Sequence, residues 1–213
     1  MNQKTWLFRL GVISLVLTIV TVSITVTINA YPLYVWELKQ SGISETYQLS
    51  IQNILTNYKV LMNYLNNPWI KQLHLPDFSS SKEGLQHFKE VKQLFFLNYF
   101  LLIVTIYPTY RFIRGLMSES QMWRLIRPFQ YLSLFPFLGF FGMIVGFDQI
   151  FVGFHKLLFR NDYWLFNPYT DPIIEVLPAS YFLHCFLLAI ICIELLFLIT
   201  LWLSKKSLTK ETE

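Results

Sequence analysis

The chain has little charge and little cysteine. Charged residues make up 14% of its 213 residues, hydrophobic residues make up 54%, and the mean hydropathy is +0.43. Soluble domains carry about 25% charged residues. The composition therefore excludes an ordinary soluble domain and indicates an integral membrane protein.

The two cysteines, Cys185 and Cys192, lie in the same hydrophobic segment. Their spacing on a helix corresponds to a rise of about 10 Å, whereas a disulfide requires Cα atoms within about 7 Å. The pair therefore cannot form a disulfide. Because an apolar environment disfavours the thiolate, we interpret both residues as packing residues rather than nucleophiles.

Common catalytic motifs are also missing from the sequence. It contains no Gly-x-Ser-x-Gly elbow, no His-Glu-x-x-His zinc motif and no glycine-rich phosphate loop. A metal site built from His87, His155 and a carboxylate remains an alternative, but its ligands would be scattered along the chain. We predict neither a metal nor another cofactor.

Hydrophobic segments are long enough to cross a bilayer, which takes about 20 apolar residues. Four segments qualify, at about residues 6–32, 94–113, 129–151 and 179–203. The apolar core of the first exceeds the usual length of about 7–15 residues in a cleaved signal peptide, so we expect it to be retained. Pro136 in the third segment permits a kink. The sequence predicts an all-α membrane protein with four transmembrane helices.

The distribution of basic residues predicts the orientation of these helices. Nine of the 17 Lys and Arg residues flank the segment ends that we assign to the cytoplasm: Lys4, Arg9, Arg111, Arg114, Arg124, Arg127, Lys205, Lys206 and Lys210. The acidic residues on that side are Glu119, Glu211 and Glu213. We therefore expect cytoplasmic N- and C-termini and two outward loops. The excess positive charge indicates this topology rather than nucleic-acid binding.

The outward loops comprise about residues 33–91 and 152–178. Apolar residues between Ser44 and Leu65 recur at helical spacing, which predicts an amphipathic helix that ends before Pro68 and forms an extracellular cap. Ser80-x-x-Glu83 predicts the start of another helix, uninterrupted until Pro108. We expect residues 1–204 to form a single transmembrane domain and residues 205–213 an irregular cytoplasmic tail.

Two histidines, His87 and His155, are predicted at the same outer membrane surface. His87 shares a helical stripe with Asn98, and a polar residue inside a span indicates the face turned to the bundle interior. Asp148 would share a helix face with His155. Histidine can act as a general base or acid at neutral pH. A pair of histidines could therefore deprotonate a nucleophile and protonate a leaving group.

Two other polar residues, His184 and Glu194, lie within the fourth segment. Polar groups inside a span are functional candidates. For His184 we favour a structural role, and for Glu194 a neutral carboxyl group that is hydrogen-bonded to another helix.

Three stretches of the sequence resemble one known family. They are Asn57-Tyr58-x-x-Leu61-x-x-Tyr64-Leu65; Leu75-Pro76-Asp77-Phe78 with Glu83, Gly84 and His87-Phe88-x-Glu90-Val91-Lys92-x-Leu94-Phe95; and Phe154-His155 with Phe159-x-Asn161-Asp162-x-Trp164, Pro168, Asp171, Ile174 and Pro178. The chain resembles the lipoprotein intramolecular transacylases, four-span membrane enzymes of Gram-positive bacteria.

This resemblance implies a reaction, a substrate and a place in the cell. The family moves the sn-2 acyl chain of an S-diacylglyceryl lipoprotein to the α-amino group of its N-terminal cysteine, giving the lyso-form. It implies catalytic roles for His87 and His155, a site at the extracellular face of the bacterial cell membrane, and contact with membrane lipid. We expect Asp148, Asn161, Trp164 and Asp171 to support the site, the three polar ones by orienting the histidines or binding the oxyanion.

Two alternatives remain open from the sequence. The first is a membrane redox protein with haem b ligated by His87 and His155. The second is a non-enzymatic membrane assembly factor, in which the outward helix between Ser44 and Leu65 would bind other proteins.

Overall fold

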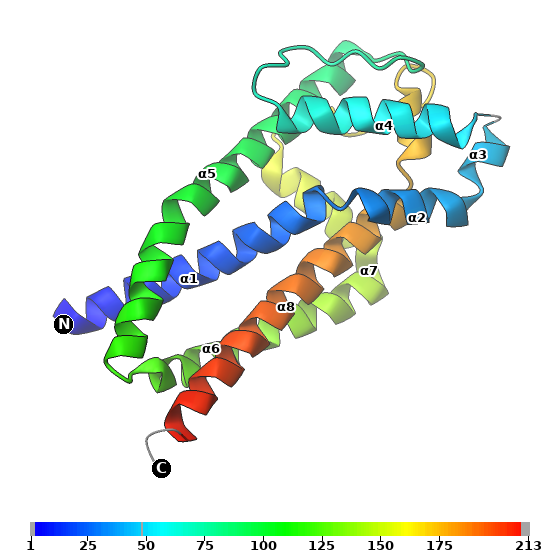
Figure 1. The fold of residues 1–213 in the computed structure, drawn as a ribbon. Coiled ribbons are helices and arrows are strands. Elements are labelled where there is room, and N and C mark those ends of the chain that lie inside the picture. Colours follow the sequence, from blue (N-terminus) through cyan, green and yellow to red (C-terminus); the bar gives the residue numbers. More distant parts are fainter. Residues whose placement is uncertain (1–2, 48, 210–213) are drawn as a thin grey trace. The chain divides into compact units, whose positions relative to one another are not determined.

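The computed structural model describes residues 3–47 and 49–209, except for the side chains of residues 3, 4, 45, 46 and 209. The described chain is helical and contains no strand. Figure 1 shows its helices α1 (Gln3–Ile28), α2 (Tyr31–Ser41), α3 (Ile43–Thr46), α4 (Ile51–Asn66), α5 (Lys82–Ser118), α6 (Ile126–Leu132), α7 (Leu134–Leu158) and α8 (Ala179–Thr209), with 3₁₀ helices η1 (Met122–Leu125) and η2 (Pro172–Val176).

Four helical stretches of the described chain are long and apolar enough to cross a membrane, which confirms the four-span prediction. They are Thr5–Ile28, Lys82–Ser118, Met122–Leu158 and Ala179–Leu208. The expectation of an irregular tail was wrong for residues 205–209, because α8 continues to Thr209. Lys210, Glu211 and Glu213 lie outside the described residues, as do the side chains of Lys4 and Glu45.

The chain divides into two compact units. The first comprises Met1–Asn29, Asn98–Val145 and Phe186–Glu213, and the second comprises Ala30–Leu97 and Gly146–Cys185. Helices α5, α7 and α8 each contribute residues to both units. The single-domain assignment of residues 1–204 stays a prediction.

Hydroxyl and amide groups join α1 to α5 in the first unit. The hydroxyl of Thr109 is hydrogen-bonded to those of Ser14 at 3.0 Å and Thr18 at 2.8 Å. Asn98 is buried and donates to Thr25 Oγ1 at 2.9 Å. Lipid tails are as apolar as apolar side chains, so burying apolar side chains does little to drive helices together in a membrane. Hydrogen bonds between polar side chains on different helices then favour their association. The prediction that Asn98 faces the interior is confirmed.

Glu194, on the part of α8 in this unit, departs from the sequence prediction. Its Oε2 atom is buried and has no hydrogen-bond partner among the described residues. The expected hydrogen bond from this carboxyl group to another helix is therefore not observed.

Three tyrosines in mutual ring contact, Tyr34, Tyr58 and Tyr181, form part of the core of the second unit. The ring of Tyr34 on α2 stacks on that of Tyr58 on α4 at 3.7 Å. The Tyr58 hydroxyl bonds to that of Tyr181 at 2.7 Å, and the Tyr34 hydroxyl donates to the Val176 carbonyl at 2.8 Å. Burying large rings with their hydroxyls paired makes this core both apolar and specific, and it fixes α2 and α4 beside each other (Figure 1).

Helix boundaries in this unit differ from the sequence predictions by a few residues. The amphipathic helix begins at Ile51 and not near Ser44, because Ser50 is the N-cap and accepts a hydrogen bond from the Asn53 amide at 3.1 Å. The segment before it forms the separate helices α2 and α3. The first turn of α5 is capped by Ser81 rather than Ser80, through a 2.9 Å bond from the Gly84 amide.

The interruption of the third span also lies elsewhere than expected. Pro136 is the third residue of α7, where a missing N–H removes no bond within the helix. The kink lies at Gly146, whose φ of −144° and ψ of 44° are not helical. Helix α5 is not interrupted at its own proline and continues through Pro108 to Ser118.

Candidate active site

The structure brings His87 on α5 and His155 on α7 together in the second unit. Their ring centroids are 6.0 Å apart, and the ring planes are inclined by 32°. Both side chains are buried, with exposed fractions of 6% and 9%. No hydrogen bond joins the two rings within the described chain, so each retains a nitrogen for another molecule.

The hydrogen bond of His155 defines its tautomer. Its Nδ1 lies 2.8 Å from the carbonyl oxygen of Phe151, one helical turn earlier. Since a carbonyl can only accept, Nδ1 donates, and in the neutral ring Nε2 carries the lone pair. Aromatic rings enclose this imidazole, with Phe151 at 4.2 Å and Trp164 at 4.8 Å between centroids. The His155 ring is thus fixed in orientation and presents the lone pair of Nε2.

His87 has a different environment. Its Nδ1 is buried and has no hydrogen-bond partner among the described residues. The rings of Phe159 and Phe166 pack edge-on against the imidazole, at 4.7 and 5.5 Å. A buried polar atom without a partner is rare and costly in native proteins. Nδ1 of His87 thus stands out as an unsatisfied group among the described residues.

Two of the predicted supporting residues, Asn161 and Trp164, connect the histidines through one chain of contacts. The Trp164 indole packs on His155 and donates its Nε1–H to the Asn161 carbonyl at 3.1 Å. The Asn161 side chain donates to both carboxylate oxygens of Glu90, at 3.1 and 3.2 Å. Glu90 follows His87 by one turn of α5, so this chain ties the loop over His155 to the helix of His87.

Asp171 binds the start of α5 rather than a histidine. The side chain is 2% exposed, and Oδ1 accepts the Ser81 amide at 2.8 Å. Thr170 donates its hydroxyl to the other oxygen at 2.7 Å. A carboxylate at the N-terminus of a helix is stabilised by the unpaired amides and the helix dipole. Asp171 therefore anchors the turn that precedes His87.

The structure does not bring Asp148 to the histidine pair through any hydrogen bond. Its side chain is exposed and makes no side-chain hydrogen bond within the described residues. The predicted supporting role of Asp148 thus stays a prediction, without a contact that favours it.

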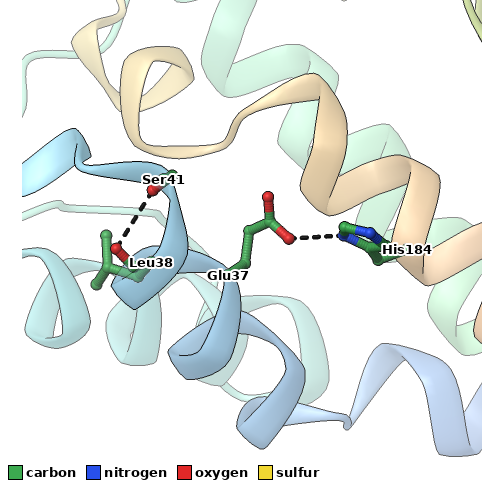
Figure 2. A network of polar contacts seen from close by, with 4 residues as sticks. All are labelled: Glu37, Leu38, Ser41 and His184. Atoms are coloured by element: carbon green, nitrogen blue, oxygen red, sulfur yellow. Dashed lines mark hydrogen bonds and ion pairs between the residues drawn. The ribbon is translucent and has the colours of Figure 1, made fainter.

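A histidine–carboxylate contact lies within the same unit, between residues other than this pair. Glu37 on α2 is buried, and its Oε2 lies 2.6 Å from Nδ1 of His184 on α8. Figure 2 shows the carboxylate directed at the imidazole. The sequence did not predict this partner for His184, because Glu37 and His184 are 147 residues apart in the chain. The contact agrees with a structural role for His184.

Two small cavities flank the histidine site. One, of about 220 Å³, lies between the start of α5 and the loop that carries Phe166 and Asp171. The other, of about 280 Å³, is lined by Glu90, Phe159 and Asn161. No group of three His, Cys, Asp or Glu residues that could bind a metal is present in the described part of the chain.

Comparison with known proteins adds a family and a fold. The model of the family "Lipoprotein intramolecular transacylase Lit" matches residues 9–182. The solved structure of the lipoprotein intramolecular transacylase Lit from Bacillus cereus is similar, with a TM-score of 0.92 at 26% identity, covering 98% of this chain and 97% of that one.

Two further structures of the Bacillus cereus protein are similar at 26% identity. One has a histidine replaced by arginine, with a TM-score of 0.84, covering 98% of this chain and 93% of that one. The other has a histidine replaced by alanine, with a TM-score of 0.84 and coverage of 98% and 94%. No curated protein matches significantly.

The family match confirms the resemblance inferred from the three sequence stretches. It decides against the haem-protein and assembly-factor alternatives, because it assigns an acyl-transfer activity. The chain belongs to the lipoprotein intramolecular transacylase family, and is a membrane-integral acyltransferase.

Proposed function

We propose that this chain moves the sn-2 acyl group of a diacylated lipoprotein to the α-amino group of its N-terminal cysteine, with His87 and His155 as the general acid and base. The observation that carries the proposal is the pair of buried imidazoles 6.0 Å apart. Each has a nitrogen that no described residue occupies with a hydrogen bond: Nε2 of His155 and the buried Nδ1 of His87.

The proton transfers of this reaction require two such groups. The amine nitrogen forms a bond to the ester carbonyl carbon, and the bond from that carbon to the glyceryl oxygen breaks. One proton leaves the nitrogen for a neutral imidazole, and one proton reaches the departing oxygen from an imidazolium. The α-amine titrates near pH 8, so it first loses a proton to become a nucleophile.

The amine and the ester belong to one molecule, so no covalent acyl-enzyme is needed. The main contribution of the protein besides proton transfer is to hold the two groups in contact. The aromatic rings around the imidazoles support this role, because their contacts hold both imidazoles in place. Trp164 and Asn161 would position His155, and Asp171 would position the first turn of the helix that carries His87.

The proposed setting is the outer face of a bacterial cell membrane, with both termini in the cytoplasm. The basic residues clustered at the ends of the spans support this orientation. Lipoprotein and membrane lipid would then reach the site from the outer leaflet.

Mass spectrometry of lipoprotein N-termini tests this function. A host that leaves its lipoproteins diacylated would express the wild type, His87→Ala, His155→Ala, or the control His74→Ala, which alters an exposed loop histidine. We expect the wild type and His74→Ala to move one acyl group to nitrogen at unchanged total mass. Each site variant should lose at least about 100-fold in rate. Unaltered N-termini with well-expressed wild type would contradict the function.

A further inference from the structure

Glu90 has a carboxylate that is hydrogen-bonded to neutral amide groups. Its Oε1 accepts from the Gln86 amide at 2.9 Å and from Asn161 at 3.1 Å, and Oε2 accepts from Asn161 at 3.2 Å. Within the described residues no Lys, Arg or His nitrogen lies at salt-bridge distance from it. Neutral amides fix the orientation of this carboxylate without neutralising it.

The carboxylate lines the cavity of about 280 Å³ together with the polar residues Gln93, Arg160 and Asn161. Leu94, Leu158 and Phe159 form the apolar part of the wall. The Phe159 ring also packs edge-on against His87 at 4.7 Å, so the cavity and the histidine share a wall. Glu90 follows His87 by three residues on α5, a spacing that places side chains on neighbouring parts of one helix face.

We propose that Glu90 is a substrate-binding residue, which receives the α-ammonium group of the lipoprotein's N-terminal cysteine beside His87. This inference rests on the proposed transacylase function. A carboxylate that is held by neutral amides, in a small cavity whose wall is partly apolar, fits a primary ammonium attached to a lipid thioether. The cavity is too small for acyl chains, which would remain in the membrane.

The charge on the nitrogen distinguishes the substrate from the product. The incoming amine binds as R–NH₃⁺, and one proton leaves it for water before the attack. Formation of the amide then releases a second proton, which is balanced by the one that the glyceryl oxygen gains. The product nitrogen is neutral, so its attraction to Glu90 is lost. Glu90 would thus favour lipoproteins with a free amine and assist release of the acylated product.

The experiment uses the full chain in lipid nanodiscs and a lipopeptide whose sn-2 ester is replaced by an ether, so that it binds without reacting. Its affinity is compared with that of a deamino counterpart, for the wild type, Glu90→Gln, Glu90→Asp and the control Glu175→Gln, which lines neither cavity. We expect the wild type, Glu90→Asp and the control to prefer the amine by about 10- to 100-fold, and Glu90→Gln to lose that preference.

A preference that survives in folded Glu90→Gln would overturn the inference. The wild type alone provides a second test that does not depend on folding of a variant. Its preference should decline as the pH rises from 7 to 9.5 and the α-amine loses its charge; a constant preference over that range would also overturn the inference. Turnover of the ester lipopeptide by the wild type, measured in parallel, reports separately on the proposed function.

Discussion

Replacing Gly84 by alanine should destabilise the protein, although helix propensity predicts the opposite. Gly84 lies in the first turn of α5, where alanine is favoured over glycine by about 1 kcal/mol. A Cβ atom at this position would, however, collide with the Asp171 carboxylate and approach the Phe166 ring at 2.9 Å. The two effects have opposite signs, so the direction of the change tests the geometry of the site.

The expected magnitude follows from the two costs. Overpacking costs about 1–3 kcal/mol. If Asp171 moves away, its bond from the Ser81 amide is lost, which costs a further 1.5–3 kcal/mol or so for a charged acceptor. After subtracting about 1 kcal/mol for helix propensity, Gly84→Ala should lower the free energy of unfolding by about 1.5–5 kcal/mol.

Thermal unfolding in a mild detergent measures the change, and Gly115→Ala is the matched control. Gly115 is on the same helix, and a Cβ atom there would meet nothing within 4 Å. We expect that control to be neutral or slightly stabilised. Asp171→Ala should lower the free energy of unfolding much less in the Gly84→Ala variant than in the wild type, because the added methyl group collides with the Asp171 carboxylate. A Gly84→Ala variant as stable as the wild type, or strictly additive effects, would refute the reasoning.

Two further predictions concern aromatic residues of the second unit. Burial raises the pKa of Tyr58 from 10.0 to about 12. The stabilisation that comes from keeping this hydroxyl protonated is therefore complete below pH 10 and is lost as the pH rises to about 12. The free energy of unfolding should fall by about 3 kcal/mol over this range. In pH-dependent unfolding, Tyr58→Phe should therefore decline less steeply than the wild type over that range, and equal slopes would contradict the assignment. Trp164→Phe keeps a ring near His155 but removes the hydrogen bond to the Asn161 carbonyl, so we expect the free energy of unfolding to fall by about 1 kcal/mol and acyl transfer to slow. Trp69→Phe, at an 86% exposed position, is the control and should change neither. Unchanged kinetics of Trp164→Phe would show that the bond does not position the imidazole.

Local patterns were sufficient to predict the four spans and to single out His87 and His155, whose rings the structure brings within 6.0 Å of each other. Four long apolar runs specify the spans. In the hydrocarbon of a membrane, a helix is the way in which a single segment can satisfy all of its backbone hydrogen bonds. Asn98 indicated the inward face correctly, since a polar amide in a span needs a partner and finds it at Thr25. The errors at Ser44 and Ser80 arose because serines lie near both helix starts, and a pattern cannot decide which one caps.

The supporting contacts could not be predicted in the same way, because they depend on the path of a loop. Asn161 and Glu90 are 71 residues apart, and Ser81 and Asp171 are 90 residues apart. The sequence contained one local indication of the second contact, a glycine in a first turn where alanine would be the better helix former. Such a glycine favours a close approach by another group, here the Asp171 carboxylate.

The loop of residues 159–171 contacts α5 in a regular order, and this order explains how the site is held together. Asp171 binds Ser81, Phe166 packs on His87, and Asn161 binds Glu90. The loop thus runs antiparallel to the helix, and its contacts fall at intervals of three or six residues on α5, close to one or two turns. A shift of the loop along the helix would break all of these contacts together and move Trp164 away from His155. The loop is therefore part of the site itself, because it sets the spacing of the two imidazoles on which the proposed proton transfer depends.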